Sequence, residues 1–199
     1  MLTSLAFVIA AYLIGSVSFA VVVSKLYGLP DPHSYGSGNP GATNVLRTGN
    51  KLAAALTVIG DGGKGFLAVF LAQSLGPSFE VADWTVPSVV LAVFIGHLFP
   101  VFHGFAGGKG VATAAGIVFA LSWPLGVALA ALWMVMALGF KISSLAALST
   151  ATLAPVGAFY VFGNAPVAWA LVPITLLLFW RHRANIRQLI EGKERTIGR

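Results

Sequence analysis

A glycine-rich stretch at residues 104–110 contains a lysine and has the composition of an anion-binding loop. Glycine lets backbone N–H groups converge on one point, because no Cβ restricts its backbone angles. An apolar run begins at Val111, so the free N–H groups and the positive dipole end of a helix should face the same point. Lys109 adds a full positive charge there. The alternative is a helix-entry loop whose lysine stem covers apolar surface.

Two other polar segments could bind phosphate. Residues 36–47 offer hydroxyl and amide groups, together with the two-pronged guanidinium of Arg47. The hydroxyl and amide groups belong to Ser37, Asn39, Thr43 and Asn44. Residues 181–186 gather arginine, histidine and asparagine side chains at the end of an apolar run. The alternatives are a flexible linker for the first segment and a plain polar helix end for the second.

Several common chemistries are excluded by residue types. The chain has no cysteine, so thiol catalysis and disulfides cannot operate. A nucleotide P-loop would need glycine at His103 and serine or threonine at Gly110. No histidine has an aspartate five residues later, so the His-x4-Asp pattern of one lipid acyltransferase class is absent. The four histidines lack metal-ligand spacing, and we therefore expect no metal site and no cofactor.

A few polar residues fall inside or beside apolar runs. Asp61 and Lys64 are three residues apart, and buried charges in a membrane are candidates for function, although a structural pair is the favoured interpretation here. His97 is interpreted as a hydrogen-bonded packing residue rather than a ligand. Ser143 and Ser144 begin an apolar run, where serine usually caps a helix but could also reach a phosphate.

The elements that carry these residues must lie in a membrane. Hydrophobic residues make up 57% of the 199 residues and charged residues only 9%. Soluble domains carry about 25% charged residues, so this chain cannot cover itself with a water-compatible surface. Its apolar residues form long uncharged runs, as a bilayer requires. The first run has no basic segment before it, which indicates a retained helix rather than a cleaved signal.

Seven helices are expected from these runs. The uncharged stretch between Lys109 and Lys141 would be about 46 Å long as one helix, against about 30 Å of hydrocarbon. Ser122 and Pro124 interrupt it, so two short helices are predicted. The predicted helices are residues 2–24, 52–76, 87–102, 111–121, 124–139, 145–162 and 166–180.

The distribution of basic residues predicts the orientation. Apart from Lys64 within the second run, the lysines and arginines fall in one set of connections and in the tail, residues 181–199, whereas the opposite connections carry Glu80 and Asp83 and no lysine or arginine. The positive-inside rule therefore places the N-terminus outside and the C-terminus in the cytoplasm. The charge bias favours seven spans over six. It also accounts for the net charge of +6 without nucleic acid. We expect an all-α integral membrane protein, a single seven-helix transmembrane bundle over residues 1–199.

Three stretches, taken in order, resemble a known family. They are residues 36–44 (Gly-Ser-Gly-Asn-Pro-Gly-Ala-Thr-Asn), residues 103–113 (His-Gly-Phe-Ala-Gly-Gly-Lys-Gly-Val-Ala-Thr) and residues 181–186 (Arg-His-Arg-Ala-Asn-Ile). This combination resembles the bacterial acyl-phosphate:glycerol-3-phosphate acyltransferases of the PlsY type. The resemblance extends over essentially the whole chain, including its length and its seven-helix layout.

The resemblance implies transfer of a fatty acyl group from acyl phosphate to the sn-1 hydroxyl of glycerol 3-phosphate, giving lysophosphatidic acid and phosphate. It also implies a multi-pass protein of the bacterial cytoplasmic (inner) membrane, with the active site facing the cytoplasm. By position it assigns catalytic roles to His182, Asn185, Lys109 and Ser37. It assigns substrate binding to Arg47, Asn39, Thr43, Asn44, Gly107, Gly108 and Ser144. The expected partners are the two substrates and membrane lipid, with the monomer as the functional unit.

The chemistry of such a transfer fits these residues. An acyl phosphate is an activated mixed anhydride, so no acyl-enzyme is needed, and orientation can supply roughly 7–11 kcal/mol of barrier reduction. His182 is the only plausible base within the three segments, but neighbouring arginines should disfavour its imidazolium. We therefore expect a substrate phosphate oxygen, with a pKa near 6, to take the proton. The alternatives are a small-anion transporter and a purely structural subunit; no internal repeat supports the former.

Overall fold

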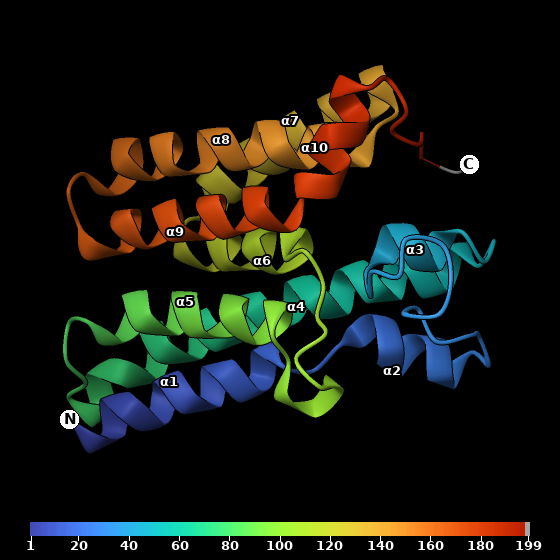
Figure 1. Ribbon diagram of the computed structural model, residues 1–199. Helices are drawn as coiled ribbons and strands as arrows, with labels where there is room; N and C mark the ends of the chain where they lie inside the picture. Colours follow the sequence, from blue (N-terminus) through green and yellow to red (C-terminus); the bar gives the residue numbers. More distant parts are fainter. Residues whose placement is uncertain (198–199) are drawn as a thin grey trace.

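The computed structural model describes residues 1–197, which form helices and loops without a strand (Figure 1). Its α-helices are α1 (Leu2–Gly15), α2 (Phe19–Leu26), α3 (Ala42–Leu46), α4 (Lys51–Leu75), α5 (Thr85–Leu98), α6 (Val111–Leu121), α7 (Trp123–Phe140), α8 (Ser143–Phe162), α9 (Pro166–Arg181) and α10 (Arg183–Ile190). Two short 3-10 helices follow α4 and α5, at Gly76–Phe79 and Val101–His103. Arg199, which the sequence analysis placed in the basic tail, lies outside the described residues.

Four helical segments are long and apolar enough to cross a bilayer: α4 and α5, each taken with the 3-10 helix that follows it, α7 and α8. The bent pair α1 and α2 would make a fifth, whereas α6 and α9 are apolar but shorter. Only 17% of the residues in the apolar helix α7 are buried inside the protein, so this helix presents most of its apolar side chains outward. Outward-facing apolar surface on this scale is suited to contact with lipid chains rather than with water.

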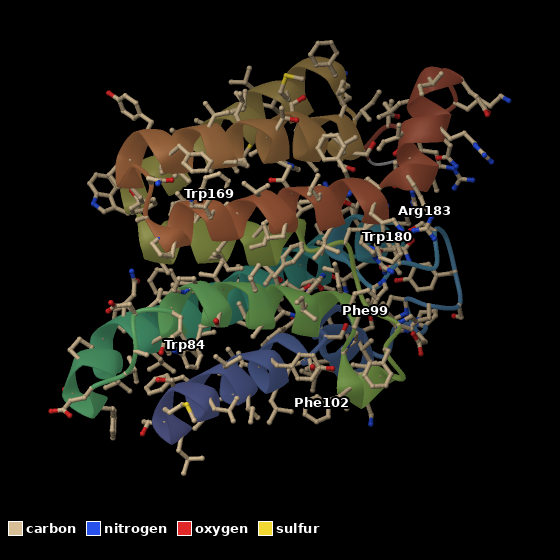
Figure 2. All side chains as sticks on the ribbon, turned by 60° about the vertical axis from the view of Figure 1, so that its left-hand side comes forward. Trp84, Phe99, Phe102, Trp169, Trp180 and Arg183 are labelled. Atoms are coloured by element: carbon tan, nitrogen blue, oxygen red, sulfur yellow. The ribbon has the colours of Figure 1, made fainter. Side chains whose placement is uncertain are left out.

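Aromatic side chains lie at two levels along the bundle (Figure 2). Trp84 and Trp169 mark one end, and Trp180 marks the other, where its ring lies 6.0 Å from that of Phe99. The guanidinium of Arg183 lies 4.9 Å from the centre of the Trp180 ring. Tryptophan is enriched where hydrocarbon meets the lipid headgroups. The two levels therefore agree with a bundle that crosses a bilayer.

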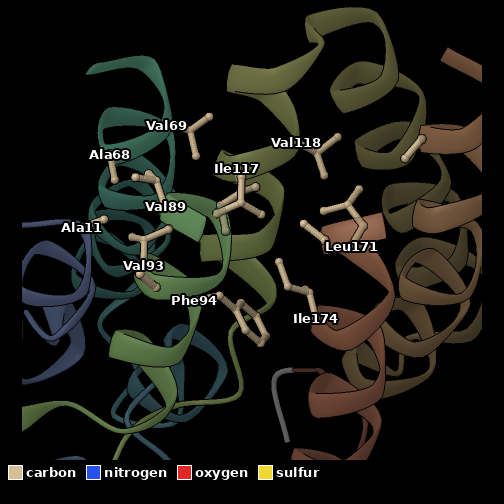
Figure 3. Packing of buried hydrophobic residues seen from close by; sticks show 14 of the residues in the cluster. Ala11, Ala68, Val69, Val89, Val93, Phe94, Ile117, Val118, Leu171 and Ile174 are labelled. Carbon is tan, nitrogen blue, oxygen red and sulfur yellow. The ribbon is translucent and has the colours of Figure 1, made fainter. Parts of the chain in front are cut away.

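The core lies where α5 meets its neighbours. Phe94, Leu98 and Ile117 are fully buried, and Figure 3 shows α5, α6 and α9 contributing side chains to the same cluster. Small residues allow α4 and α6 to pack very closely, because a Cβ added at Gly116 would lie 1.9 Å from the carbonyl oxygen of Gly62. Close approach at glycine is a usual way for helices to associate in a membrane, where burial of apolar surface provides little driving force.

The first predicted span, residues 2–24, is broken in the structure. Helix α1 ends at Gly15, α2 begins at Phe19, and the two are bent by 43°. The buried pair Asp61–Lys64, whose charged groups lie 2.8 Å apart, forms hydrogen bonds with the backbone on both sides of the break. The Lys64 ammonium donates to the carbonyl of Val17 at 2.6 Å, and the backbone N–H of Phe19 donates to the Asp61 carboxylate at 3.4 Å. Each charge also lies at the helix end whose dipole it complements. The structural interpretation of this pair agrees with these contacts.

Other boundaries follow local sequence signals. Residues 111–140 form two helices separated at Ser122, as predicted, and the Ser122 hydroxyl accepts from the N–H of Leu125. Within the span predicted for residues 87–102, the α-helix ends at Leu98, because Pro100 lacks the N–H that would continue it, and the 3-10 helix Val101–His103 extends the segment. Helices α3 and α10 lie within segments that were interpreted only as a polar loop and a basic tail.

Candidate active site

The polar segments from all three sequence stretches line one cavity of about 550 Å³. It lies at the end of the bundle that carries α3 and α10 (Figure 1). Of the eleven residues predicted for the site, nine line the cavity: Ser37, Asn39, Thr43, Asn44, Arg47, Lys109, Ser144, His182 and Asn185. Gly107 and Gly108 are not part of its wall. Nine residues that are separated in the sequence are thus brought to one cavity, and their roles in binding or catalysis stay predictions.

Asn44 organises the first segment from within. Its side chain is buried, and its amide nitrogen donates to the carbonyls of Pro32 and Tyr35 at 2.8 and 3.1 Å. Its oxygen accepts from the N–H of Ser37 and from the guanidinium of Arg47, both at 3.0 Å. Both donors and both acceptor positions of the amide are thus used inside the protein. Asn44 positions the serine and the arginine rather than offering its own hydrogen bonds to a ligand.

The glycines of the second segment permit a close approach to α5. A Cβ at Gly107 would lie 2.1 Å from the carbonyl oxygen of His97, and one at Gly108 would lie 2.3 Å from the His97 ring. The N–H of Gly108 donates to the His97 carbonyl at 3.2 Å, so it does not face an anion as the sequence analysis expected. The carbonyls of both glycines accept from Arg181 of α9. These two residues therefore fix the path of the loop, and Lys109 and Gly110 are the loop residues that reach the cavity.

His33 ties the first segment to the glycine loop. Its Nδ1 lies 2.7 Å from the carboxylate of Asp31, and its Nε2 lies 2.9 Å from the carbonyl oxygen of Ala106. Hydrogen bonds from His33 to Asp31 lower the pKa of that carboxyl. Sequence reasoning missed this residue because its partner at position 106 is distant in the chain.

Lys109 lies half-buried in the cavity wall. Its ammonium donates to Oδ1 of Asn185 at 2.5 Å, which connects the glycine loop to α10. Burial, with smaller contributions from the charges of Arg181 and Arg47, lowers the pKa of Lys109 to about 8, although the charge of Glu194 opposes the shift. A bound phosphate would restore the preference for the charged form, since it would add negative charge beside the ammonium. The lysine is therefore suited to receive an anion.

His182 is buried at the junction of α9 and α10. Its Nδ1 lies 2.8 Å from the carbonyl oxygen of Leu178, which can only accept, so Nδ1 carries the hydrogen. In the neutral ring Nε2 then offers a lone pair. Burial lowers the pKa of His182 to about 4; the Leu178 hydrogen bond opposes this, while Lys109 and Arg181 add to it. The arginine effect was predicted, but burial is the larger cause. The ring is neutral at ordinary pH and a weak proton acceptor.

Glu194 is a site residue that the sequence analysis missed. Its Oε1 accepts from the hydroxyl of Ser144 at 2.7 Å and from the amide nitrogen of Asn185 at 2.6 Å. The tail returns over the cavity after Gly192, which has a positive φ of 65°, and the N–H of Ile197 donates to the Lys141 carbonyl. A glycine after α10 signals a helix end, but it gives no direction for the chain that follows.

Beyond its polar end the cavity continues between apolar walls. These walls come from α6, α7, α8 and α9 and include Val118, Phe119, Leu129, Trp133, Ala151, Leu171 and Ile174. An alkyl chain would fit such walls, because it needs apolar contact and no hydrogen bonds. One cavity thus combines basic and hydroxyl groups with space for a hydrocarbon tail.

Comparison with known proteins agrees with this arrangement. The family model described as glycerol-3-phosphate acyltransferase matches residues 5–192. A glycerol-3-phosphate acyltransferase from Cupriavidus pinatubonensis is 61% identical, with 99% of this chain and 98% of the relative covered. One from Neisseria meningitidis serogroup B is 54% identical, with 96% of each chain covered.

The fold is also similar to that of a solved membrane protein. The crystal structure of PlsY (YgiH), an integral membrane glycerol 3-phosphate acyltransferase, in its glycerol 3-phosphate form has a TM-score of 0.90 and 38% identity, with 98% of this chain and 96% of that chain covered. The lysophosphatidic acid form gives a TM-score of 0.88 at the same identity. The chain therefore belongs to the glycerol-3-phosphate acyltransferase family and is an all-helical integral membrane enzyme that acylates glycerol 3-phosphate.

Proposed function

We propose that the acyl donor is acyl phosphate and that the chain transfers its acyl group to the sn-1 hydroxyl of glycerol 3-phosphate. The products are lysophosphatidic acid and inorganic phosphate. The observation that carries the proposal is the single cavity, which joins a basic polar end to apolar walls. Both substrates bring a phosphate to the polar end, and the donor also brings a hydrocarbon chain. The glycerol 3-phosphate and lysophosphatidic acid forms of the similar PlsY structure support an acceptor and a product of these kinds.

The basic side chains hold the two phosphates in this proposal. Lys109 anchors the phosphate of the acyl donor, while Arg47 and Ser37 bind phosphate from the opposite wall, where Asn44 holds them. Asn39, Thr43 and Ser144 also line the cavity and can donate hydrogen bonds. A charge-assisted hydrogen bond is roughly twice as strong as a neutral one, so the lysine and the arginine contribute most of the binding.

Transfer proceeds directly between the two bound substrates. The sn-1 oxygen attacks the acyl carbonyl carbon, the bond from that carbon to the phosphate oxygen breaks, and the hydroxyl proton passes to a phosphate oxygen. Phosphate has a second pKa near 6, so its oxygen is more basic than the His182 ring, whose pKa is about 4. His182 accepts a hydrogen bond from the attacking hydroxyl through the lone pair on Nε2, and so orients it before the proton moves to the phosphate oxygen. Asn185, held by Lys109 and Glu194, lies beside the reacting carbonyl.

We also propose seven spans, with the N-terminus outside and the cavity facing the cytoplasm of the bacterial inner membrane. The bent pair α1 and α2 counts as one span, and α6 and α9 cross although they are short. Lys109, Lys141 and the basic residues of α10 all lie at the end of the bundle that carries the cavity. Both substrates can reach a cavity at this end, one from the cytoplasm and one from the membrane. A monomer already contains every residue of the proposed site.

The donor is tested directly with purified protein in detergent. Acyl phosphate with glycerol 3-phosphate should yield inorganic phosphate and lysophosphatidic acid in equal amounts, and omission of either substrate should stop both. Acyl-coenzyme A should not replace acyl phosphate, because in the proposed reaction the donor phosphate accepts the hydroxyl proton and supplies the negative charge that Lys109 binds. Product formation from the thioester at a comparable rate would contradict the assignment of the donor.

Orientation is tested by cysteine labelling, since the chain has no cysteine of its own. Single cysteines in place of Asp83 and Asn164 should react with an impermeant thiol reagent in intact cells. Cysteines in place of His103 and Lys141 should react only after permeabilisation, which serves as the control for reactivity. Labelling of residue 141 from outside would contradict the separation of α6 and α7 into two spans.

Lys109→Ala should lower kcat/KM for acyl phosphate by roughly 10- to 150-fold, the cost of about 1.5–3 kcal/mol for a lost charge-assisted contact. Lys109→Arg should also be impaired, because its larger fork does not fit the close loop. The matched control is Lys193→Ala, an exposed lysine that pairs with Glu191 on the surface. In the wild type, kcat/KM should fall as the pH rises through about 8, where Lys109 loses its charge. Unchanged activity of Lys109→Ala would refute the anchor.

His182→Gln keeps one hydrogen-bonding group and should retain partial activity. Because the pKa of His182 is about 4, the acidic limb of the pH–rate profile belongs to a substrate phosphate and should remain near pH 6 in the variant. The measurement is kcat and kcat/KM between about pH 4 and 9 for both proteins. Loss of that limb together with a fall in kcat of about 10²–10⁴ would make His182 the general base.

A further inference from the structure

One oxygen of Glu194 has no partner. Its Oε2 is buried in the cavity wall, and no residue among 1–197 donates a hydrogen bond to it. The other oxygen, Oε1, accepts from both Ser144 and Asn185. The side chain is thus held by one oxygen, while the second is left without a donor in the wall of the cavity that the proposed substrates occupy.

An unpartnered buried carboxylate oxygen carries a desolvation cost, so it should be matched by a donor when the site is filled. The protein does not supply this donor. The other carboxylate that lines the cavity, Asp61, differs because Lys64 contacts it at 2.8 Å. Glu194 is therefore the acidic group of the described cavity wall that is left to accept from a ligand.

The acceptor substrate has groups that can fill this role. A phosphate accepts hydrogen bonds when it is fully ionised, and its negative charge would be repelled by the carboxylate. Glycerol 3-phosphate also carries two hydroxyls, which donate. In the proposed function the sn-1 hydroxyl gives its proton to a phosphate oxygen, so that donor is already committed. The sn-2 hydroxyl remains, and it needs an acceptor when it enters a desolvated site.

We propose that Oε2 of Glu194 accepts a hydrogen bond from the sn-2 hydroxyl of glycerol 3-phosphate, which makes Glu194 a residue that determines acceptor specificity. The inference rests on the proposed function, because it needs glycerol 3-phosphate in the cavity. Held at Oε1 by α8 and α10, the carboxylate aligns the glycerol backbone. A site built to bind a hydroxyl discriminates strongly against an analogue without it, since its own polar group is then left unpaired.

The test compares two acceptors and two proteins. Glycerol 3-phosphate is compared with 3-hydroxypropyl phosphate, which lacks the sn-2 hydroxyl, in the wild type and in Glu194→Gln. Glutamine keeps an oxygen for Ser144 and Asn185 but places an N–H donor at the second position. We expect the wild type to prefer glycerol 3-phosphate in kcat/KM by roughly tenfold or more, and the preference to collapse in the variant. The loss should be clearly larger with glycerol 3-phosphate than with the analogue.

An equal loss with both acceptors would overturn the proposal, because it would indicate either a structural role or a general base acting on the sn-1 hydroxyl. Glu191→Gln is the matched control: the same change on an exposed carboxylate three residues away, which pairs with Lys193 on the surface. It should preserve both the activity and the acceptor preference. Thermal unfolding and size-exclusion profiles in detergent report whether the folds of the variants are intact.

A second measurement needs no variant and remains informative if Glu194→Gln does not fold. In 2-fluoro-3-hydroxypropyl phosphate, fluorine can accept weakly but cannot donate. The wild type should use this acceptor no better than 3-hydroxypropyl phosphate, because fluorine would face the carboxylate oxygen. Activity close to that with glycerol 3-phosphate would overturn the proposal. Failure of the proposed function looks different: glycerol 3-phosphate itself would then not be acylated from acyl phosphate.

Discussion

The buried pair of Asp61 and Lys64 makes it possible for the first apolar run to break inside the bundle. Lys64 donates a hydrogen bond to the carbonyl of Val17, and Asp61 accepts one from the N–H of Phe19. The backbone groups that lose their helical partners at the break are therefore hydrogen-bonded inside the protein. The same region is tied to α6, because the Thr113 hydroxyl donates to the Asp61 carbonyl at 3.0 Å and lies 3.1 Å from the His97 ring. The junction of α1 and α2, together with segments from α5 and α6, therefore meets around Asp61 and Lys64 of α4.

The position of the glycine loop follows from that arrangement. The ring of His97 in α5 lies within hydrogen-bond distance of the Thr113 hydroxyl, and the backbone carbonyl of His97 accepts a hydrogen bond from the N–H of Gly108. The loop can lie against α5 only because Gly107 and Gly108 lack side chains, and Arg181 of α9 holds its carbonyls from the other side. The side chain of Lys109 extends from this fixed loop, and its ammonium donates a hydrogen bond to Asn185. A displacement of α5 would thus move the lysine, which orientation-dependent catalysis would not tolerate.

Sequence reasoning succeeded where signals are local and failed where partners are remote. The apolar runs, the interruption near Pro124 and the three polar segments could be read directly, and the segments together identified the family. The break in the first run was missed because its cause lies in α4, more than forty residues later. Glu194 and His33 were missed for the same reason, since their partners are set by tertiary structure. Asn44 was predicted to bind substrate, whereas in the structure its side-chain amide forms all of its hydrogen bonds with other groups of the protein.

The low pKa values of Lys109 and His182 have a common origin in burial beside other positive groups. Burial makes the charged form of each group less favourable than it is in water, and a bound phosphate would offset this effect. In the proposed reaction, two phosphates bring negative charge to this end of the bundle, and one of them also supplies the proton acceptor. The protein can then keep its histidine neutral and needs no strong base of its own. Its remaining task is to align a hydroxyl with an already activated carbonyl, for which a rigid wall of hydrogen-bonded side chains is sufficient.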